Sequence, residues 1–317
     1  MITTVTPNPS LDRTLQLGRF ALGHVNRAIA TMVEPSGKGV NVALALHRAG
    51  IDARAVLPVG GGAGREIASM LDDLGLQHVD VPITGAVRSN VSLVEADGRS
   101  TKVNEPGPQL SDAEVDALCA KALAGTAVGE WALWAGSLPG GFTPQRLADA
   151  VADARAAGRL VAVDSSGPAL TRVLSQHGDR LPHMVKPNAE ELAELAGRPL
   201  TTLGDAADAA RVLIARGVRT VLISLGQNGA LLVDVDLPTP LHGHAAARRV
   251  VNTVGAGDAF LAGWLAALHS GVTPAEALAN ALRFGATAVE QEGTLIGVPD
   301  PDRPVTIVEA NASTPLG

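Results

Sequence analysis

The sequence predicts an α/β fold, doubly wound, in which a mostly parallel sheet is flanked by helices. Short runs of aliphatic and β-branched residues alternate with longer stretches of helical periodicity along most of the chain. Alternation of this kind produces right-handed βαβ units with parallel strands. The core must be mainly aliphatic, because hydrophobic residues make up 46% of the 317 residues, with four phenylalanines, three tryptophans and no tyrosine. Such a core suits parallel strands that are covered on both faces.

The strands expected in the main sheet are short and apolar, and helical segments alternate with them. Strand-like composition occurs at residues 2–6, 131–135, 160–164, 183–186 and 220–224, and helical periodicity at residues 144–157, 190–196, 205–216, 258–269 and 274–290. Ser111 and Glu114 form a capping box that begins a further helix. Residues 227–229, between two apolar runs, predict a hairpin and one antiparallel edge. We expect the tail to fray from about Ala310.

Two segments depart from this alternation. Residues 13–32 and 88–103 alternate like strands although they lie between helical stretches. We therefore expect one α/β domain over residues 1–317, with a small second sheet built from these two segments. Ligands of open α/β sheets bind beyond the carboxyl ends of the strands, where a small sheet acts as a lid.

Composition argues against several classes of function. A formal net charge of −7 argues against general affinity for nucleic acid. No apolar run approaches the ~20 residues of a membrane span, and the first residues lack the pattern of a signal peptide. Cys119 is the single cysteine, so no intramolecular disulfide forms, and we expect it to be a small buried apolar residue. We expect a cytoplasmic protein with neither a nucleic-acid nor a membrane partner.

The most informative segment is residues 252–258, which precede an apolar helix. Gly255, Ala256 and Gly257 form a glycine turn at the start of that helix, where free backbone N–H groups and the helix dipole favour an anion. Asp258 follows directly, although a carboxylate would repel an anion bound there. General-base catalysis on a hydroxyl that attacks a phosphate gives this aspartate a chemical purpose.

Three other polar positions fit the same pocket, and each has a simpler alternative. Asp12 follows the first strand and can accept hydrogen bonds from sugar hydroxyls, or it can close a turn. The glycine loop at residues 36–43 suits close approach of a ligand, or it is a plain helix start. It is not a Walker A loop, because Gly39 follows Lys38. Arg88 can bind a phosphate bidentately, or it can be a solvated arginine.

Residues 186–191 end a strand and begin a helix. Asn188 and Glu191 are three residues apart, on one face of the first turn, where they can orient the water shell of Mg²⁺. The same spacing fits a helix-capping arrangement, and the sequence leaves the two equally open.

Two further motifs carry little functional weight. His242 and His244 lack a third metal ligand and are expected in a surface loop. The glycines of residues 60–64 do not complete a dinucleotide fingerprint, so we interpret them as a flexible turn near the substrate.

Together these motifs resemble the ribokinase-like, pfkB-type carbohydrate kinases, in order and over nearly the whole chain. The resemblance is strongest to the phosphosugar branch of that family. The matching segments are 8–12, 37–41, 136–139, 186–188 with Glu191, 224–226 and 253–258.

The resemblance implies ATP-dependent phosphoryl transfer to a sugar phosphate with Mg²⁺, with a monovalent cation as a further candidate. It makes Asp258 the base and gives the anion hole to Gly255, Ala256 and Gly257. It assigns Asp12, Gly37, Lys38, Gly39 and Asn41 to the sugar, and Arg88, Ser137 and Arg27 to its phosphate, Arg27 from a partner subunit in a homodimer paired through the lid. It assigns Lys186, Asn188, Glu191, Ser224, Gly226, Gly229, Thr253 and Asn280 to the nucleotide, with Mg²⁺ at Asn188 and Glu191 through water.

Within this resemblance, the loop at residues 101–108 implies fructose 1-phosphate as the acceptor, with fructose 6-phosphate and tagatose 6-phosphate as alternatives. Two other classes of function are possible for such a sequence, a nicotinamide-dependent oxidoreductase and a sugar-phosphate sensor without activity. The incomplete glycine fingerprint argues against the first, and the presence of both Asp258 and the anion hole argues against the second.

Overall fold

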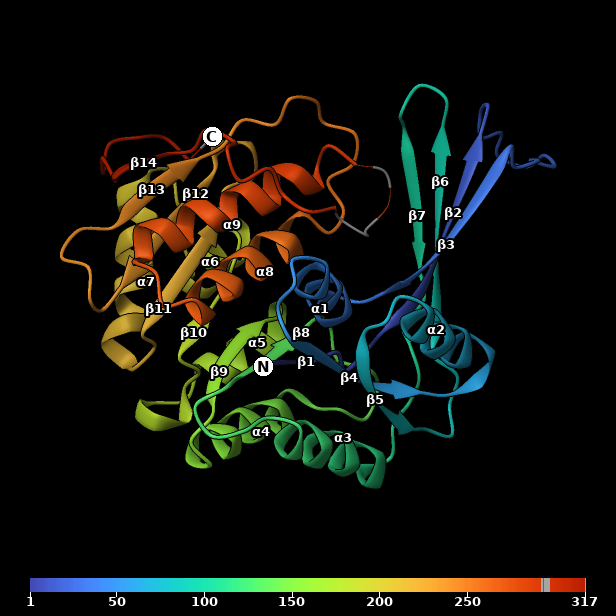
Figure 1. The fold of residues 1–317 in the computed structure, drawn as a ribbon, viewed down its shortest axis with the longest axis horizontal. Helices are drawn as coiled ribbons and strands as arrows, with labels where there is room; N and C mark the ends of the chain where they lie inside the picture. Colours follow the sequence, from blue (N-terminus) through green and yellow to red (C-terminus); the bar gives the residue numbers. More distant parts are fainter. Residues whose placement is uncertain (292, 294–296, 317) are drawn as a thin grey trace.

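Two β-sheets organise the computed structural model, which describes residues 1–291, 293 and 297–316 (Figure 1). The larger sheet has ten strands in the order β14-β13-β12-β11-β10-β9-β8-β1-β4-β5. Neighbours from β11 to β5 are parallel, and those from β14 to β11 are antiparallel. The strands are β1 (Ile2–Val5), β4 (Ala53–Val59), β5 (Gln77–Pro82), β8 (Trp131–Ala135), β9 (Leu160–Asp164), β10 (Met184–Val185), β11 (Thr220–Ser224), β12 (Ala230–Asp234), β13 (Leu241–His244) and β14 (Thr306–Glu309).

Helices cover both faces of this sheet, which confirms the doubly wound arrangement. The two faces carry separate apolar clusters, and alternate residues of β4 enter them: Leu57 lies in one and Val56 in the other. The first face carries α1 (Lys38–Arg48), α2 (Gly61–Asp73), α8 (Ala256–His269) and α9 (Pro274–Ala288). The second carries α3 (Asp112–Ala124), α4 (Pro144–Ala156), α5 (Gly167–Leu174), α6 (Ala189–Ala196) and α7 (Leu203–Arg216), and two short 3₁₀ turns are η1 (Gly178–Arg180) and η2 (Gly226–Asn228).

The local predictions for caps and turns are confirmed. Ser111 accepts a hydrogen bond from the Glu114 N–H and completes the capping box of α3. The turn at residues 227–229 joins β11 to β12, which pair antiparallel with Ser224 opposite Ala230. Residues 183–186 form only the two-residue strand β10.

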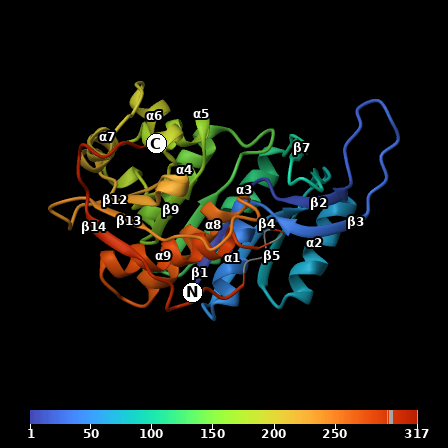
Figure 2. The same cartoon turned by 90° about the horizontal axis from the view of Figure 1, so that it is seen from above.

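The second sheet has four strands in the order β3-β2-β6-β7 and projects from the body of the protein (Figures 1 and 2). Its strands are β2 (Ser10–Leu17), β3 (Ala30–Ser36), β6 (Arg88–Glu95) and β7 (Ser100–Asn104). Residues 18–29, which we expected to continue the strand pattern, instead link β2 to β3 as a loop that Figure 2 shows extended beyond the sheet. Ser10 pairs with Ser36 at one end of β2 and Gln16 with Ala30 at the other, so this loop lies at the end of β2 remote from Asp12.

Three expectations about individual segments are wrong. The tail does not fray from Ala310, because Leu316 N–H donates to the Thr201 carbonyl at 2.9 Å and the Leu316 side chain is buried. Residues 60–64 are not a flexible turn, since they begin helix α2. Residues 242–244 are not a surface loop, because they belong to β13 within the main sheet.

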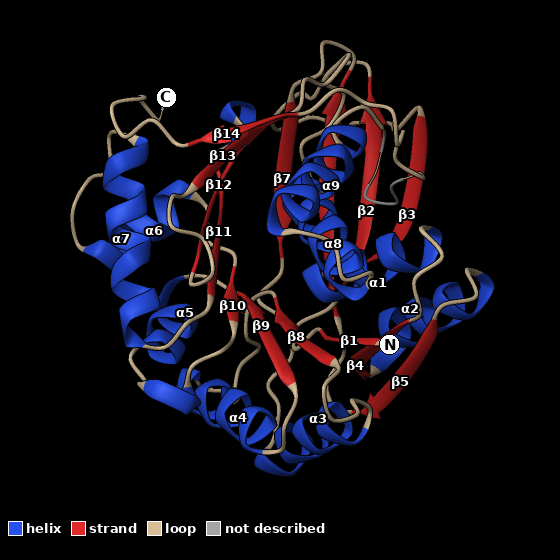
Figure 3. Cartoon of the chain, turned by 60° about the vertical axis from the view of Figure 1, so that its left-hand side comes forward, coloured by secondary structure: helices blue, strands red, loops and turns tan. Residues whose placement is uncertain are grey.

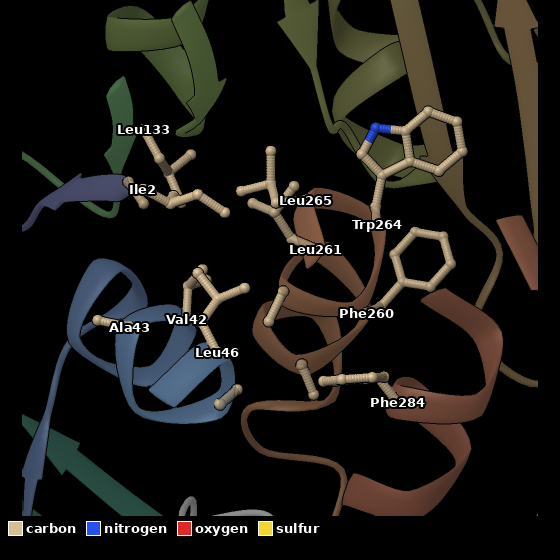
Figure 4. Packing of buried hydrophobic residues seen from close by; sticks show 14 of the residues in the cluster. Ile2, Val42, Ala43, Leu46, Leu133, Phe260, Leu261, Trp264, Leu265 and Phe284 are labelled. Carbon is tan, nitrogen blue, oxygen red and sulfur yellow. The ribbon is translucent and has the colours of Figure 1, made fainter. Parts of the chain in front are cut away.

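The nearly buried helix α8 positions the functional site, and its packing depends on small residues. Figure 4 shows Leu261 and Leu265 of α8 directed at the sheet and α1. On the other side α9 approaches very closely, because Gly263 has no side chain: a Cβ there would lie 2.8 Å from the Phe284 ring. Figure 3 shows α8, α9 and α1 stacked beside one another. No helix among the described residues is long and apolar enough to cross a membrane.

We predict that Gly263→Ala destabilises the protein by about 1–3 kcal/mol, because the new methyl group forces α9 away from α8. Gly62→Ala in α2 is the matched control, since a Cβ there meets nothing within 4 Å and alanine favours helix by up to about 1 kcal/mol. Urea denaturation of both variants tests this. Equal stability of the two would contradict the close packing of α8 and α9.

Candidate active site

Asp258 lies in the first turn of α8, which begins at Ala256 after the N-cap residue Gly255. Gly255 has a φ of 77°, a left-handed conformation that favours glycine, and no side chain caps the helix. The Asp258 side chain is buried, and its Oδ2 accepts a hydrogen bond of 2.8 Å from Nδ2 of Asn41 on α1. The structure therefore places a buried carboxylate beside a helix N-terminus without a side-chain cap, as the sequence predicts.

The environment of Asp258 raises the pKa of its carboxyl to about 6. Burial is the main cause, and the nearby Asp164 carboxylate adds to it, while Lys38 acts in the opposite direction. A carboxyl with this pKa is largely ionised at neutral pH and is still a stronger proton acceptor than an ordinary aspartate. Asp258 is thus suited to the role of a base.

Asp164, at the carboxyl end of β9, is a central residue that the sequence analysis missed. It is fully buried and lies between two lysines: Lys38 Nζ is 3.0 Å from its Oδ1, and Lys186 Nζ is 3.3 Å from its Oδ2. Burial alone would raise the pKa of Asp164, but the two lysines together hold it below its ordinary value. Asp164 in turn raises the pKa of Lys38, so that lysine stays charged.

The two lysines extend this charge network to the start of α8. Lys186 Nζ lies 3.7 Å from the place where a Cβ on Gly257 would be. Lys38 is close enough to Asp258 to interact with its carboxylate. Two ammonium groups and a helix N-terminus therefore converge on one point, which is the electrostatic environment that a transferring phosphoryl group needs.

The glycine loop before α1 packs tightly against the first strand. Gly37 has a φ of 124°, and a Cβ on Gly39 would collide with the Thr6 hydroxyl. Gly136 also takes a left-handed conformation and lies against Lys38. Glycine at positions 37 and 39 allows the loop to approach Thr6, and Gly136, whose positive φ favours glycine, lies beside Lys38.

The predicted sugar-binding residues lie where the second sheet joins the body. Asp12 Oδ1 accepts hydrogen bonds from Ser10 Oγ at 2.7 Å and Asn90 Nδ2 at 2.9 Å. Because Asp12 pairs in register with Asn90 of the neighbouring strand, its side chain is held by the sheet and does not close a turn.

Arg88 is not a solvated arginine, which was the simpler alternative. Its Nη1 donates to the Glu105 carbonyl at 3.1 Å and its Nη2 to the Asn8 carbonyl at 3.2 Å. Asn8 Nδ2 in turn donates to Ser137 Oγ at 3.2 Å. The structure thus brings Arg88 and Ser137 together, whereas Arg27 lies in the exposed loop at the remote end of β2.

On the nucleotide side, Asn188 and Glu191 form a capping box at the start of α6. Asn188 Oδ1 accepts from the Glu191 N–H at 2.8 Å, and Glu191 Oε2 accepts from the Asn188 N–H at 2.9 Å. The capping alternative is therefore realised, and the magnesium role stays a prediction. The described residues contain no group of three or more His, Cys, Asp or Glu side chains that could hold a metal.

The remaining nucleotide-side residues lie near this capping box or along α8. Asn188 forms a parallel bridge with Ser224, which places the loop with Gly226 and Gly229 beside it. The Thr253 carbonyl accepts from the Ala256 N–H at 3.4 Å. Asn280 donates its amide to the Gly263 carbonyl at 2.7 Å, so this side chain links α9 to α8, and its contact with adenine stays a prediction.

A second ion pair, partly buried and also missed from the sequence, supports the loop that leads into residues 252–258. Arg303 is almost fully buried, and its Nη2 lies 2.6 Å from Glu290 Oε2. Its Nη1 also donates to the Ala246 carbonyl at 2.8 Å. Glu290 and Arg303 are far from this loop in sequence, so no local motif reveals the contact.

Comparison with known proteins agrees with this geometry. Residues 6–301 match the model of the pfkB family carbohydrate kinases. The chain belongs to this family. It is 35% identical over 300 residues to 1-phosphofructokinase of Vibrio cholerae, covering 93% of this chain and 92% of the relative, and 37% identical over 297 residues to 1-phosphofructokinase of Haloferax volcanii, covering 93% of each.

Solved structures lead to the same family. Phosphofructokinase-2 from Escherichia coli in complex with potassium superimposes with a TM-score of 0.88 at 31% identity, covering 94% of this chain and 95% of that one. The ribokinase-like fold and the kinase class expected from the sequence are therefore confirmed. As a member of this family, the chain is a phosphotransferase that acts on a sugar hydroxyl.

We predict that Asp164→Asn lowers kcat of this kinase by at least about tenfold, because two buried ammonium groups lose their counter-charge and their fixed positions. The free energy of unfolding should also fall, by roughly 3–5 kcal/mol for breaking a buried pair. Steady-state kinetics at a temperature where the variant is folded measures the first effect. Asp236→Asn, at an exposed Arg219 pair, is the control and should change neither quantity. Unchanged kcat in Asp164→Asn would contradict the positioning role.

Proposed function

We propose that this enzyme transfers the γ-phosphoryl group of ATP to fructose 1-phosphate and produces fructose 1,6-bisphosphate and ADP. The observation that carries the proposal is the buried Asp258 carboxylate, beside the N-terminus of α8 and within reach of the charges of Lys38 and Lys186. The name of the Vibrio and Haloferax relatives supports the choice of acceptor.

The reaction is an in-line displacement at phosphorus. The acceptor hydroxyl forms the new O–P bond and gives its proton to Asp258, while the bond to ADP breaks and ADP leaves with its electron pair. The backbone N–H groups of Gly255 and Gly257 would donate to the oxygens of the moving phosphoryl group, and that of Ala256 would join them by giving up its long 3.4 Å contact with the Thr253 carbonyl. Because the transition state is loose, Asp258 orients the hydroxyl as well as accepting its proton.

Magnesium fits the residues on the nucleotide side. Mg²⁺ usually keeps several waters and takes one or two carboxylates together with substrate phosphates. Asn188 and Glu191 offer an amide oxygen and a carboxylate at the start of α6, with Lys186 nearby in the chain. When bound, the ion would neutralise phosphate charge, and these residues would hold its water shell. A monovalent cation is a further candidate, because the Escherichia coli structure contains potassium.

The acceptor is held between the body and the second sheet. Asp12 and Asn41 would bind its hydroxyls, and the loop of Gly37, Lys38 and Gly39 would lie along the sugar. Arg88 and Ser137 would take its phosphate.

Arg27 can reach this phosphate only from another subunit, so we propose a homodimer paired through the second sheet. The loop that carries Arg27 exposes Leu22, Val25 and Ile29, with 87%, 81% and 75% of their surface accessible. Apolar side chains this exposed, on one loop, are typical of an interface. We place the enzyme in the cytoplasm, where ATP and sugar phosphates are available.

A steady-state comparison of three acceptors tests the proposal. Fructose 1-phosphate should have the highest kcat/KM with ATP, above fructose 6-phosphate and tagatose 6-phosphate, because each competitor leaves polar groups of the site unpaired. Fructose 6-phosphate is the second candidate, since a structure of phosphofructokinase-2 from Escherichia coli similar to this chain is in complex with fructose-6-phosphate. A higher kcat/KM for either alternative would replace the acceptor and keep the kinase class.

The role of Asp258 has its own test. Asp258→Asn should lower kcat by at least about a hundredfold, since the amide keeps the shape but cannot accept the proton. ATP affinity, measured by equilibrium binding, should stay within about twofold because the backbone anion site is unchanged. A near-normal kcat would remove Asp258 from the role of base.

A further inference from the structure

The loop at residues 225–229, which follows β11, is held by two distant parts of the chain. The loop closes on itself, because the Leu225 N–H donates to the Gly229 carbonyl at 2.9 Å. Gly226 and Gly229 take left-handed conformations, with φ of 59° and 86°. Two glycines in so short a loop increase its freedom in isolation, so contacts from outside must select its conformation.

The first support is the C-terminal tail. Asn228 Nδ2 donates to the Leu316 carbonyl at 2.7 Å, across 88 positions of sequence. The tail is itself fixed: Leu316 N–H donates to the Thr201 carbonyl at 2.9 Å, and the Leu316 side chain is buried in the same apolar cluster as Leu225. The tail therefore presents a carbonyl of defined position to Asn228.

The second support comes from β13, in the antiparallel part of the main sheet. His242 Nε2 lies 2.9 Å from the Asn228 carbonyl, which can only accept, so this nitrogen carries a proton and donates. Gly229 packs directly on the backbone of Gly243, where any Cβ would collide with the Gly243 carbonyl. Asn228 is thus held by its side chain from the tail and by its carbonyl from β13.

We infer that His242 and the C-terminal tail are positioning residues for ATP, which act through Asn228 to pre-organise the loop at residues 225–229. The inference rests on the proposed function, in which Ser224, Gly226 and Gly229 border the nucleotide. A loop that is already ordered costs less free energy to bind, so the two supports increase nucleotide affinity without taking part in the chemistry. The hydrogen bond to the Asn228 carbonyl also gives His242 a role that does not require a metal.

Two variants remove one support each. His242→Phe keeps the ring but loses the donor, and His244→Phe is the matched control two residues along β13, where the side chain is exposed. Truncation after Thr314 removes the Leu316 carbonyl and keeps the Thr314 carbonyl that accepts from the Leu203 N–H. Neither change touches Asp258 or its lysines.

We expect His242→Phe and the truncated enzyme each to raise KM for ATP by about 2–10-fold, the equivalent of the one hydrogen bond that each change removes from Asn228. KM for the sugar phosphate and kcat should stay within about twofold, and His244→Phe should match the unmodified enzyme. A purely structural role would lower the melting temperature and the amount of active enzyme but would leave KM for ATP unchanged. That outcome would overturn the inference.

Hydrogen exchange separates failure of the inference from failure of the proposed function. The backbone amides of residues 224–229 in the unmodified enzyme should exchange more slowly when ATP and magnesium are added. Protection there with normal KM in the variants would overturn only the positioning role. Phosphoryl transfer without protection would overturn the nucleotide placement, and absence of phosphoryl transfer to any of the three acceptors would overturn the proposed function itself.

Discussion

The site depends on one buried carboxylate, Asp164, held between Lys38 and Lys186. Its two oxygens contact the two ammonium groups at 3.0 and 3.3 Å, and it has no access to solvent. A buried charge is costly unless it is paired, so each of the three side chains restricts the other two. The pairing fixes the start of α1 and the end of β10 relative to β9, and the resulting positive charge lies beside the N-terminus of α8. The anion site is therefore built by the sheet and by the helix together.

This arrangement also determines the state of Asp258. Burial raises the pKa of its carboxyl to about 6, and Lys38 keeps it from rising further. A more distant lysine would let the pKa of the carboxyl rise further, and a more solvated carboxyl would be a weaker base. Both the burial of Asp258 and its distance from Lys38 depend on dense packing. Helix α8 packs closely against α9 at Gly263, and α1 packs closely against β1 at Gly39. The packing of α8 and α1 therefore sets the burial of Asp258, and through it the pKa of its carboxyl.

Much of the fold and the central motif could be predicted from local sequence, whereas long-range contacts could not. The βα alternation, the capping box at Ser111 and the glycine turn before Asp258 are local patterns with a direct physical meaning. Asp164 was recognised only as the end of a strand, because nothing local indicates that two lysines converge on it. The docked tail and the strand that contains His242 were missed for the same reason, since their partners lie far away in sequence. Asn188 and Glu191 show a further limit of prediction from sequence, because the same three-residue spacing fits both a helix cap and a metal site.

The chemistry of this site depends on Asp258 being a buried base with a raised pKa. The most direct measurement is a ¹³C NMR titration of the aspartate carboxyl groups, with the Asp258 signal assigned by its absence in Asp258→Asn. We predict a midpoint near 6, so that the carboxyl is protonated below this pH and becomes able to accept a proton as the pH rises through it. Replacement of Lys38 by methionine should raise the midpoint further, because the lysine favours the charged form. A midpoint near the ordinary value of 3.8 would contradict the account.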